Sequence, residues 1–377
     1  MADTSLYLQL ALEPGLGPVS IRRLLDHFGG IQTLMGAPES ALRKVPGITS
    51  RHVLAILHAR KTDPRPEREE ADRAGVSILT QDDPLYPPSL LAVHSPPCVL
   101  YMKGHLSQAD HRAMAMVGTR GASQYAMEQA GRFSGALARE GYCVISGMAR
   151  GVDTASHMGA LQAGGRTVAV LGCGLGVGMK RLFVDQGGRL AESIAAAGAL
   201  VSEYPMAWPP SRQTFPRRNR IIAAWGLALL VIEAPLRSGS LITAHYAVEM
   251  GKTVYALPGR VDQSGTAGSH SLIREGAQLV TCPADILADL ESMAPPADPS
   301  PRAPEIPLMP PPSPVPEILS EADQAIVQAL AKDPLAIDQL VAVTGLAARD
   351  IASRLFFMEM RRAVRKMPGN IYQLATR

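Results

Sequence analysis

Short apolar runs separated by longer Ala- and Leu-rich segments dominate residues 80–290 of the chain. The runs are three to six residues long and show no polar alternation, which is typical of strands buried on both faces. They comprise residues 113–117, 143–145, 167–171, 227–232 and 253–257. Buried strands that alternate with helices predict an α/β core over residues 66–292, with an extended, Rossmann-like, doubly wound and mostly parallel sheet.

Residues 1–65 have helical spacing instead. Two apolar stripes repeat at three- and four-residue intervals, and a tight glycine turn at 15–17 or 46–48 precedes each; they comprise Ile21, Leu24, Leu25 and Phe28, then Val53, Ile56 and Leu57. The pattern predicts a small helical domain of helix-hairpin-helix or SAM-like type, whose turn amides would meet DNA phosphates. A helical domain whose glycines only interrupt helices fits equally well.

Prolines make up about half of the segment that follows the core. Such a composition cannot pack, so residues 293–316 are predicted to be an extended linker. Beyond it, residues 317–377 show three short helical patterns and a final hairpin around the turn at 368–370. This order predicts a winged-helix domain.

The distribution of charged residues along the chain is more informative about a binding partner than the net charge. The formal net charge is only +3, but basic residues cluster at 217–220 and again at 361–366. Dense clusters matter more than totals when a phosphate backbone is the partner.

The remaining composition excludes several classes of protein. The four cysteines, at positions 98, 143, 173 and 282, have no metal or disulfide spacing. No secretory signal is recognisable, and the longest apolar run, Ile221 to Ile232, is too short to span a bilayer. We therefore expect a cytoplasmic protein without a metal, a membrane partner or a catalytic centre.

Small and polar turn residues follow four of the predicted strands. In an open parallel sheet these turns share the binding edge, where helix N-termini and close backbone approach suit phosphates. The candidate DNA-binding residues in these turns are Gly118, Arg120, Ser146, Gly147, Arg150 and Ser238. The glycines at 172, 174 and 176 form an incomplete dinucleotide fingerprint, because Val177 stands where the last glycine belongs, and there is no P-loop. No cofactor is predicted.

The segment from Phe215 to Arg220 carries the densest positive charge. Guanidinium forks suit phosphate oxygens, and an adjacent phenyl ring suits a base, so Phe215, Arg217, Arg218, Asn219 and Arg220 are candidate DNA ligands. The alternative is a solvated basic loop anchored by its phenylalanine. Asp153 and His157 fall on one helical face, where capping is favoured over acid–base chemistry.

These motifs together resemble the DprA/Smf family. The resemblance is carried by Gly118-Thr119-Arg120, by residues 146–153 with His157, and by residues 202–205, 215–220, 238–244 and 258–259. It implies a dimeric Rossmann-like core that binds single-stranded DNA and loads RecA recombinase, protecting incoming DNA during natural transformation. It also transfers a DNA-binding role to Arg120, Arg150, Phe215, Arg218, Asn219 and Arg220, with Lys252 near the same edge.

The chain departs from the family pattern at two places. Residues 178–181 replace a usual Tyr-Pro pair, and His270 replaces a usual asparagine. The first departure bears on a loop at one end of the expected groove, and the second on a local turn.

Two other functions remain open. A nucleotide phosphoribohydrolase of the lysine-decarboxylase-like group shares a related core, but its Pro-Gly-Gly-x-Gly-Thr turn is missing before Glu249. A transcription regulator would use the winged helix, with Arg349, Arg354 and Arg361 on duplex phosphates.

Overall fold

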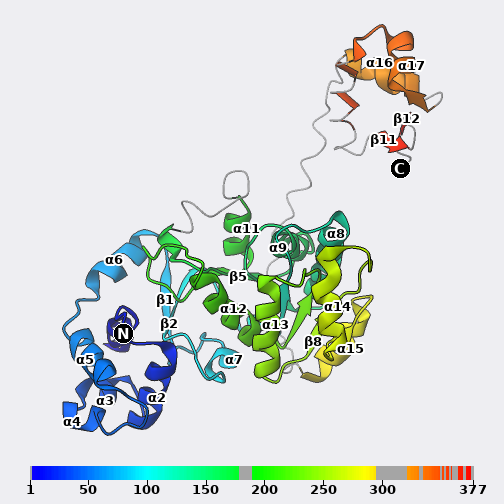
Figure 1. Cartoon of the computed structure of the whole chain (residues 1–377). Coiled ribbons are helices and arrows are strands. Elements are labelled where there is room, and N and C mark those ends of the chain that lie inside the picture. The colour runs from blue at the N-terminus through cyan, green and yellow to red at the C-terminus, as the bar shows by residue number, and fades with distance from the viewer. Residues whose placement is uncertain are drawn as a thin grey trace. The chain divides into compact units, whose positions relative to one another are not determined.

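The computed structural model describes residues 2–177, 189–293, 321–330, 334–348, 350–351, 354–355, 358, 364–367 and 371–374. The chain divides into two compact units, Met1–Pro304 and Glu305–Arg377 (Figure 1). The division falls within the proline-rich segment, whose residues 294–316 lie outside the described residues. The finer domain boundaries inferred from the sequence stay predictions.

A nine-stranded sheet forms the centre of the described part of the first unit, in the order β1-β2-β6-β5-β4-β3-β7-β8-β9. The edge pairs β1–β2 and β2–β6 are antiparallel, and all other pairs are parallel. The strands are β1 (Ser77–Thr80), β2 (Val99–Gly104), β3 (Ala113–Val117), β4 (Cys143–Ser146), β5 (Thr167–Val170), β6 (Ala199–Ser202), β7 (Ala228–Val231), β8 (Val254–Ala256) and β9 (Gln278–Leu279). The predicted doubly wound α/β sheet is confirmed.

Helices cover both faces of this sheet (Figure 1). In β3, Ala115 and Val117 pack in one apolar cluster with α12 and α13, whereas Met114 and Met116 pack in another with α8 and α9. One layer contains α12 (Thr214–Trp225), α13 (Gly239–Glu249) and α14 (Ala267–Arg274), and the other contains α8 (Gln124–Arg139), α9 (Val152–Gln162) and α11 (Arg189–Ala197). Burial on both sides explains why the strands are apolar at every position.

The strand order reverses direction at β3. Strands β4, β5 and β6 follow on one side of it, and β7, β8 and β9 on the other. The connections leaving β3 and β7 therefore diverge, which opens a crevice at their carboxyl ends. The binding edge predicted from the sequence therefore lies where these two central strands end.

The N-terminal helices share an apolar core with the antiparallel edge of the sheet. Ile21, Leu24 and Leu25, from the predicted stripe, are buried in the same cluster as Val99 and Tyr101 of β2. The helices are α1 (Ala2–Ala11), α2 (Pro18–Phe28), α3 (Ile31–Gly36), α4 (Glu39–Leu42), α5 (Ser50–Ala59) and α6 (Arg65–Arg73). The helical prediction for this region is confirmed.

The remaining elements of the first unit are α7 (Pro88–Leu91), η1 (Gln108–His111), η2 (Ser264–Thr266) and α15 (Ala284–Met293), which packs in the same cluster as α8 and α9. Cys98, Cys143 and Cys173 are buried, as expected of isolated thiols in apolar runs. Among the described residues, no group of side chains has the composition of a metal site, and no helix is long and apolar enough to cross a bilayer.

The second unit has the elements of a winged helix. Helices α16 (Glu321–Leu330) and α17 (Ile337–Thr344) accompany a sheet of order β10-β12-β11, made of β10 (Leu335–Ala336), β11 (Val364–Met367) and β12 (Ile371–Leu374). Its own apolar cluster includes Ile326, Leu330, Leu340, Ile351 and Leu355. The predicted C-terminal hairpin is confirmed, while its turn at 368–370 lies outside the described residues.

Candidate nucleic-acid interface

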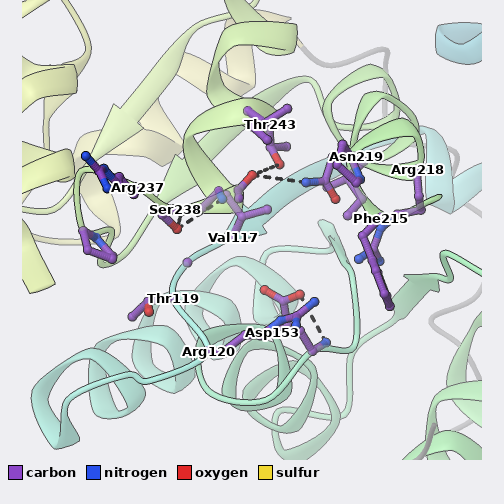
Figure 2. A pocket seen from close by; sticks show the side chains of 18 residues that line it. Val117, Thr119, Arg120, Asp153, Phe215, Arg218, Asn219, Arg237, Ser238 and Thr243 are labelled. Carbon is purple, nitrogen blue, oxygen red and sulfur yellow. Dashed lines mark hydrogen bonds between the residues drawn. The ribbon is translucent and has the colours of Figure 1, made fainter. Parts of the chain in front are cut away.

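A cavity of about 330 Å³ opens at the carboxyl ends of β3 and β7 (Figure 2). Four segments line it: residues 117–120 at the end of β3, residues 149 and 153 around the start of α9, residues 215, 216, 218, 219 and 222 of α12, and residues 235, 237–240, 242 and 243 around the start of α13. Figure 2 shows Arg120 and Asp153 on one side of the cavity and Ser238, Thr243 and Asn219 on the other. The cavity lies at the predicted binding edge, where the strand order reverses.

The turn after β3 is fastened to the end of β7. The amide of Thr119 donates to the Glu233 carbonyl oxygen at 2.8 Å, and the buried Glu233 carboxylate accepts from the amide and the hydroxyl of Ser123. Ser123 in turn caps α8 by accepting from Ala126. Glu233 was missed at the sequence level, although an acidic residue directly after a buried strand was a signal.

The turn after β4 presents its backbone in an unusual conformation. Met148 has a φ of 56° and Gly151 a φ of 78°, so the chain reverses within a few residues. The hydroxyl of Ser146 is buried and donates to the Met116 carbonyl oxygen at 2.7 Å. The side chain of Arg150, by contrast, is exposed. Of the predicted ligands in this turn, Arg150 is therefore the one whose side chain faces solvent.

Asp153 and His157 do not form an acid–base pair with each other. Asp153 accepts from the amide of Ala149 at 3.3 Å, within the turn that precedes α9. Burial raises the pKa of this carboxyl, and the nearby Arg218 guanidinium opposes that rise. His157 instead bonds through Nδ1 to the Thr167 hydroxyl at 2.7 Å. These contacts agree with the structural role favoured from the sequence.

Residues 215–220 belong to the first turns of α12, rather than to a segment that precedes it. Arg218 is 4% exposed and donates to the carbonyl oxygens of Gly147 and Val170. The pKa of Arg218 is lowered by burial, which the charge of Asp153 counteracts. A Cβ atom at Gly147 would displace the Arg218 guanidinium from this position.

Two further predicted ligands are engaged inside the protein. Arg220 is buried and donates to the Glu203 carboxylate and, at 2.7 Å, to the Ser95 carbonyl oxygen. The Lys252 ammonium donates to the carbonyl oxygens of Ala224 and Gly226 at the end of α12, and burial lowers its pKa to about 8. Both groups thus hold α12 in place, where sequence reasoning expected DNA contacts.

At the mouth of the cavity an arginine lies over an aromatic ring. The guanidinium carbon of Arg120 is 5.2 Å from the centroid of Phe215. Arg120 is exposed and Phe215 is half-buried against Gly172, which has no room for a Cβ atom beside the ring. Such a cation–π pair orients both groups while leaving guanidinium donors free for another partner.

The cavity brings together six of the twelve predicted ligands, namely Gly118, Arg120, Phe215, Arg218, Asn219 and Ser238. Arg217 lies on the exposed side of α12, and Asn219 donates through Nδ2 to the Gly239 carbonyl oxygen at 3.2 Å. The structure adds Arg237, an exposed residue that lines the cavity and that sequence reasoning missed. Its position directly before the Ser238-Gly239-Ser240 turn was the available signal.

The chemistry of the lining suits an anion. The described lining residues include three arginines, Arg120, Arg218 and Arg237, but one carboxylate, that of Asp153. The N-terminus of α13 also opens into the cavity, with Ser238 accepting from the amide of Ser240. Helix amides and guanidinium groups bind phosphate oxygens, and Phe215 adds an aromatic surface beside them.

The two departures from the family pattern have different outcomes. Residues 178–181 lie outside the described residues. His270 bonds through Nε2 to the backbone of Gly259, with its nitrogen 3.3 Å from the amide and 3.1 Å from the carbonyl oxygen. His270 therefore contacts the turn at Gly259, and the local effect of this departure stays a prediction.

Comparison with known proteins agrees with this geometry. The family described as DNA recombination-mediator protein A matches residues 77–291, and the DprA winged helix domain matches residues 310–370. Protein Smf from Synechocystis sp. is 35% identical over 401 residues, covering 99% of both chains.

Two solved structures are also similar. DNA processing protein A from Streptococcus pneumoniae superposes with a TM-score of 0.66 and 31% identity, over 76% of this chain and 97% of that one. DNA processing protein A from Helicobacter pylori, solved to examine its single-stranded DNA binding mode, gives a TM-score of 0.51 and 26% identity, over 58% and 97% of the two chains.

Proposed function

Because the chain belongs to the DprA/Smf family of DNA recombination-mediator proteins, we propose that it binds single-stranded DNA at the cavity between β3 and β7. The observation that carries this proposal is the Arg120–Phe215 pair at the cavity mouth, 5.2 Å apart. It offers a phosphate ligand and a stacking surface side by side, and a single strand presents both a phosphate and an unstacked base. The bases of a duplex stay stacked inside the helix, out of reach of Phe215.

The exposure of each predicted residue decides whether we propose it as a direct DNA ligand. Arg120, Arg150, Arg217 and Arg237 are exposed and would bind backbone phosphates. Asn219 and Ser238 line the cavity, and Gly118 allows the strand close approach. Arg218, Arg220, Lys252, Ser146 and Gly147 would act indirectly, by fixing α12 and the turn after β4.

We further infer that the bound strand is the substrate for RecA loading, so that the protein protects incoming DNA during natural transformation. The family's mediator role supports this step, because a mediator must hold the strand on which the recombinase assembles. The resemblance also supports a homodimer formed through the Rossmann-like core, acting in the cytoplasm.

We expect the site to work by binding rather than by catalysis. A phosphoribohydrolase needs a carboxylate at the sugar, but Glu249 is exposed on α13 and does not line the cavity. A function as a transcription regulator is less favoured, because Arg354, one of the arginines expected to contact duplex phosphates, forms an ion pair with Asp323 at 2.7 Å. Arg349 and Arg361 lie outside the described residues.

Fluorescence anisotropy of labelled poly-dT and of a matched duplex, over a salt series, tests the proposal. We expect the single strand to bind more tightly, with affinity that falls linearly in log salt as counterions are released. Arg120→Ala should weaken binding and make the salt slope shallower by about one. Arg132→Ala, which removes an exposed arginine in the middle of α8, is the matched control and should change neither.

Absent binding to the single strand, or binding that Arg120→Ala leaves unchanged, would contradict the proposal. Release of free base from nucleoside monophosphates would then favour the phosphoribohydrolase. Tight, sequence-specific duplex binding would favour the regulator.

A further inference from the structure

We propose that Trp208 forms a second stacking surface for a base of the same single strand, beyond the cavity mouth. The inference rests on the proposed function, since it extends the path of the strand along the carboxyl edge from β7 toward β6. Trp208 lies in the connection between β6 and α12, outside the lining of the cavity.

Trp208 is unusually exposed for a tryptophan, and its indole is stacked on a neighbouring ring. Its side chain is 41% exposed, whereas Trp225, the other tryptophan of the chain, is 1% exposed. The indole stacks on the buried Tyr204 ring, with centroids 6.0 Å apart and planes inclined by 21°. One face of the indole is therefore turned toward Tyr204, and the exposed part of the side chain is offered to an aromatic ligand.

The backbone around Trp208 is fixed by hydrogen bonds to neighbouring segments. The Trp208 carbonyl oxygen accepts from Gly174 at 2.9 Å, and its amide donates to the Pro205 carbonyl oxygen at 2.9 Å. Met206 donates to the Glu67 carboxylate at 2.7 Å. Gly174 has no room for a Cβ atom, because the Pro205 carbonyl oxygen occupies that space. A stacking surface on such a loop is preorganised, which lowers the entropy cost of binding.

Tyr204 connects this surface to the cavity mouth. Its hydroxyl donates to the carbonyl oxygen of Thr214 at 3.4 Å, the residue directly before Phe215. Because β6 is parallel to β5, and β5 to β4 and β3, the connection after β6 leaves the sheet at the same edge as the turn after β3. Trp208 and Phe215 thus lie along one edge, separated by the Tyr204–Thr214 contact.

Positive charge lies between the two aromatic surfaces. Arg212 and Arg217 are exposed on the connection and on α12. Burial raises the pKa of the Tyr204 phenol, and the charges of Arg220 and Arg217 act against that rise. The nearby carboxylates are occupied, Glu203 by Arg220 and Glu67 by the Met206 amide. A strand spanning the two rings would therefore meet, at its phosphates, two exposed guanidinium groups for which the described residues provide no ion pair.

The two tryptophans make a direct test possible. Trp225 is buried and donates through its indole nitrogen to the Asp110 carbonyl oxygen at 3.1 Å, so bound DNA should not reach it. The full-length protein is titrated with labelled dT oligomers of increasing length, recording tryptophan emission and strand anisotropy together. We expect emission to be quenched by long strands, but not by the shortest strand that still binds.

Trp208→Ala should abolish the quenching and weaken binding of long strands by about 5- to 100-fold, the usual contribution of one stacked base. Binding of the shortest strand should stay unchanged, and Trp208→Phe should retain part of the affinity. Leu54→Ala, which removes an exposed apolar side chain on α5, is the matched control.

The outcomes separate this inference from the function on which it rests. Strand binding without quenching, and with Trp208→Ala equal to the unsubstituted protein at every length, overturns the second surface and leaves the cavity as the binding site. Absence of strand binding at every length overturns both. If Trp208→Ala does not fold, the quenching by long strands and the affinity of Trp208→Phe decide the question.

Discussion

At the residue scale, the hydrogen bonds around Thr167 determine which ring nitrogen of His157 carries the proton. The Thr167 hydroxyl donates to the Val144 carbonyl oxygen at 2.7 Å, so its own proton is already used. His157 must therefore donate from Nδ1 to the Thr167 oxygen, 2.7 Å away. Its Nε2 is buried without a partner among the described residues. This arrangement favours the neutral ring.

A pH dependence of stability follows. Burial, together with the charge of Arg218, lowers the pKa of His157 from 6.5 to about 3 in the folded protein. Below pH 6.5 the unfolded chain takes up a proton that the folded protein refuses, so this contribution is present above pH 6.5 and is lost as the pH falls. Between pH 7 and pH 5 we expect a loss of about 2 kcal/mol in the free energy of unfolding.

Urea unfolding at both pH values, for the unsubstituted protein and for His157→Asn, measures this contribution. The asparagine amide can replace the Nδ1 donor but does not titrate. Asp153 and Glu203, whose pKa values burial raises, are present in both proteins, so the difference between them isolates the histidine. Equal pH dependence in the two proteins would show that His157 is not the group responsible.

At the element scale, α12 separates arginines that are adjacent in sequence. Successive side chains of a helix point about 100° apart, because one turn contains 3.6 residues. Arg217 therefore faces solvent, Arg218 reaches the carbonyl oxygens of Gly147 and Val170, and Arg220 reaches Glu203. One basic cluster thus contributes both to the exposed surface and to the internal support of α12.

This difference predicts opposite behaviour for two neighbouring substitutions. Arg218→Ala leaves Asp153 and two carbonyl oxygens buried without their partner, so unfolding should become easier by about 3–5 kcal/mol. Arg217→Ala should change stability by less than about 0.5 kcal/mol. It should instead weaken binding of the single strand and make the salt slope shallower by about one. Urea unfolding and anisotropy of labelled poly-dT measure the two effects.

The opposite pattern would reassign the ligands. If Arg218→Ala retained the stability of the unsubstituted protein and lost only DNA affinity, Arg218 would be a direct phosphate contact, as its motif suggests.

Most strands with continuous apolar runs were predicted from the sequence, but β2 was not, although its residues Val99–Met102 are all apolar and buried. Strands β3, β4, β5, β7 and β8 are apolar runs, and all five were predicted. Strand β6 follows the Ala-rich helix α11 without a change in composition, and β9 is two exposed residues long. These strands exist because the neighbouring strand offers them backbone partners, and that information is not local in sequence.

The site was predictable to a similar extent. Glycine turns and arginines at strand ends pointed to the edge where the cavity lies, because parallel strands gather those turns there. The sequence did not show that Glu233 holds a serine 110 residues away, that Arg220 is buried, or that Lys252 bonds to the end of α12. All three depend on the strand order, which brings β3 beside β7 and fixes the position of α12.

At the scale of the whole molecule, the proposed DNA-binding site belongs to the first of the two compact units. Every residue that lines the cavity belongs to Met1–Pro304, whereas the winged helix has an apolar cluster of its own. Separate apolar cores unfold as separate cooperative units. Strand recognition should therefore not require the second unit.

A chain that ends at residue 293 tests this division. We expect it to bind poly-dT within about threefold of the full chain, a difference below 1 kcal/mol, because all proposed ligands are retained. It should also show one unfolding transition, at the position of the corresponding transition in the full chain. Arg120→Ala in the shortened chain should weaken binding as it does in the full chain. If shortening alone removed strand binding, the winged helix would have to contribute ligands, and the cavity between β3 and β7 would be only part of the binding site.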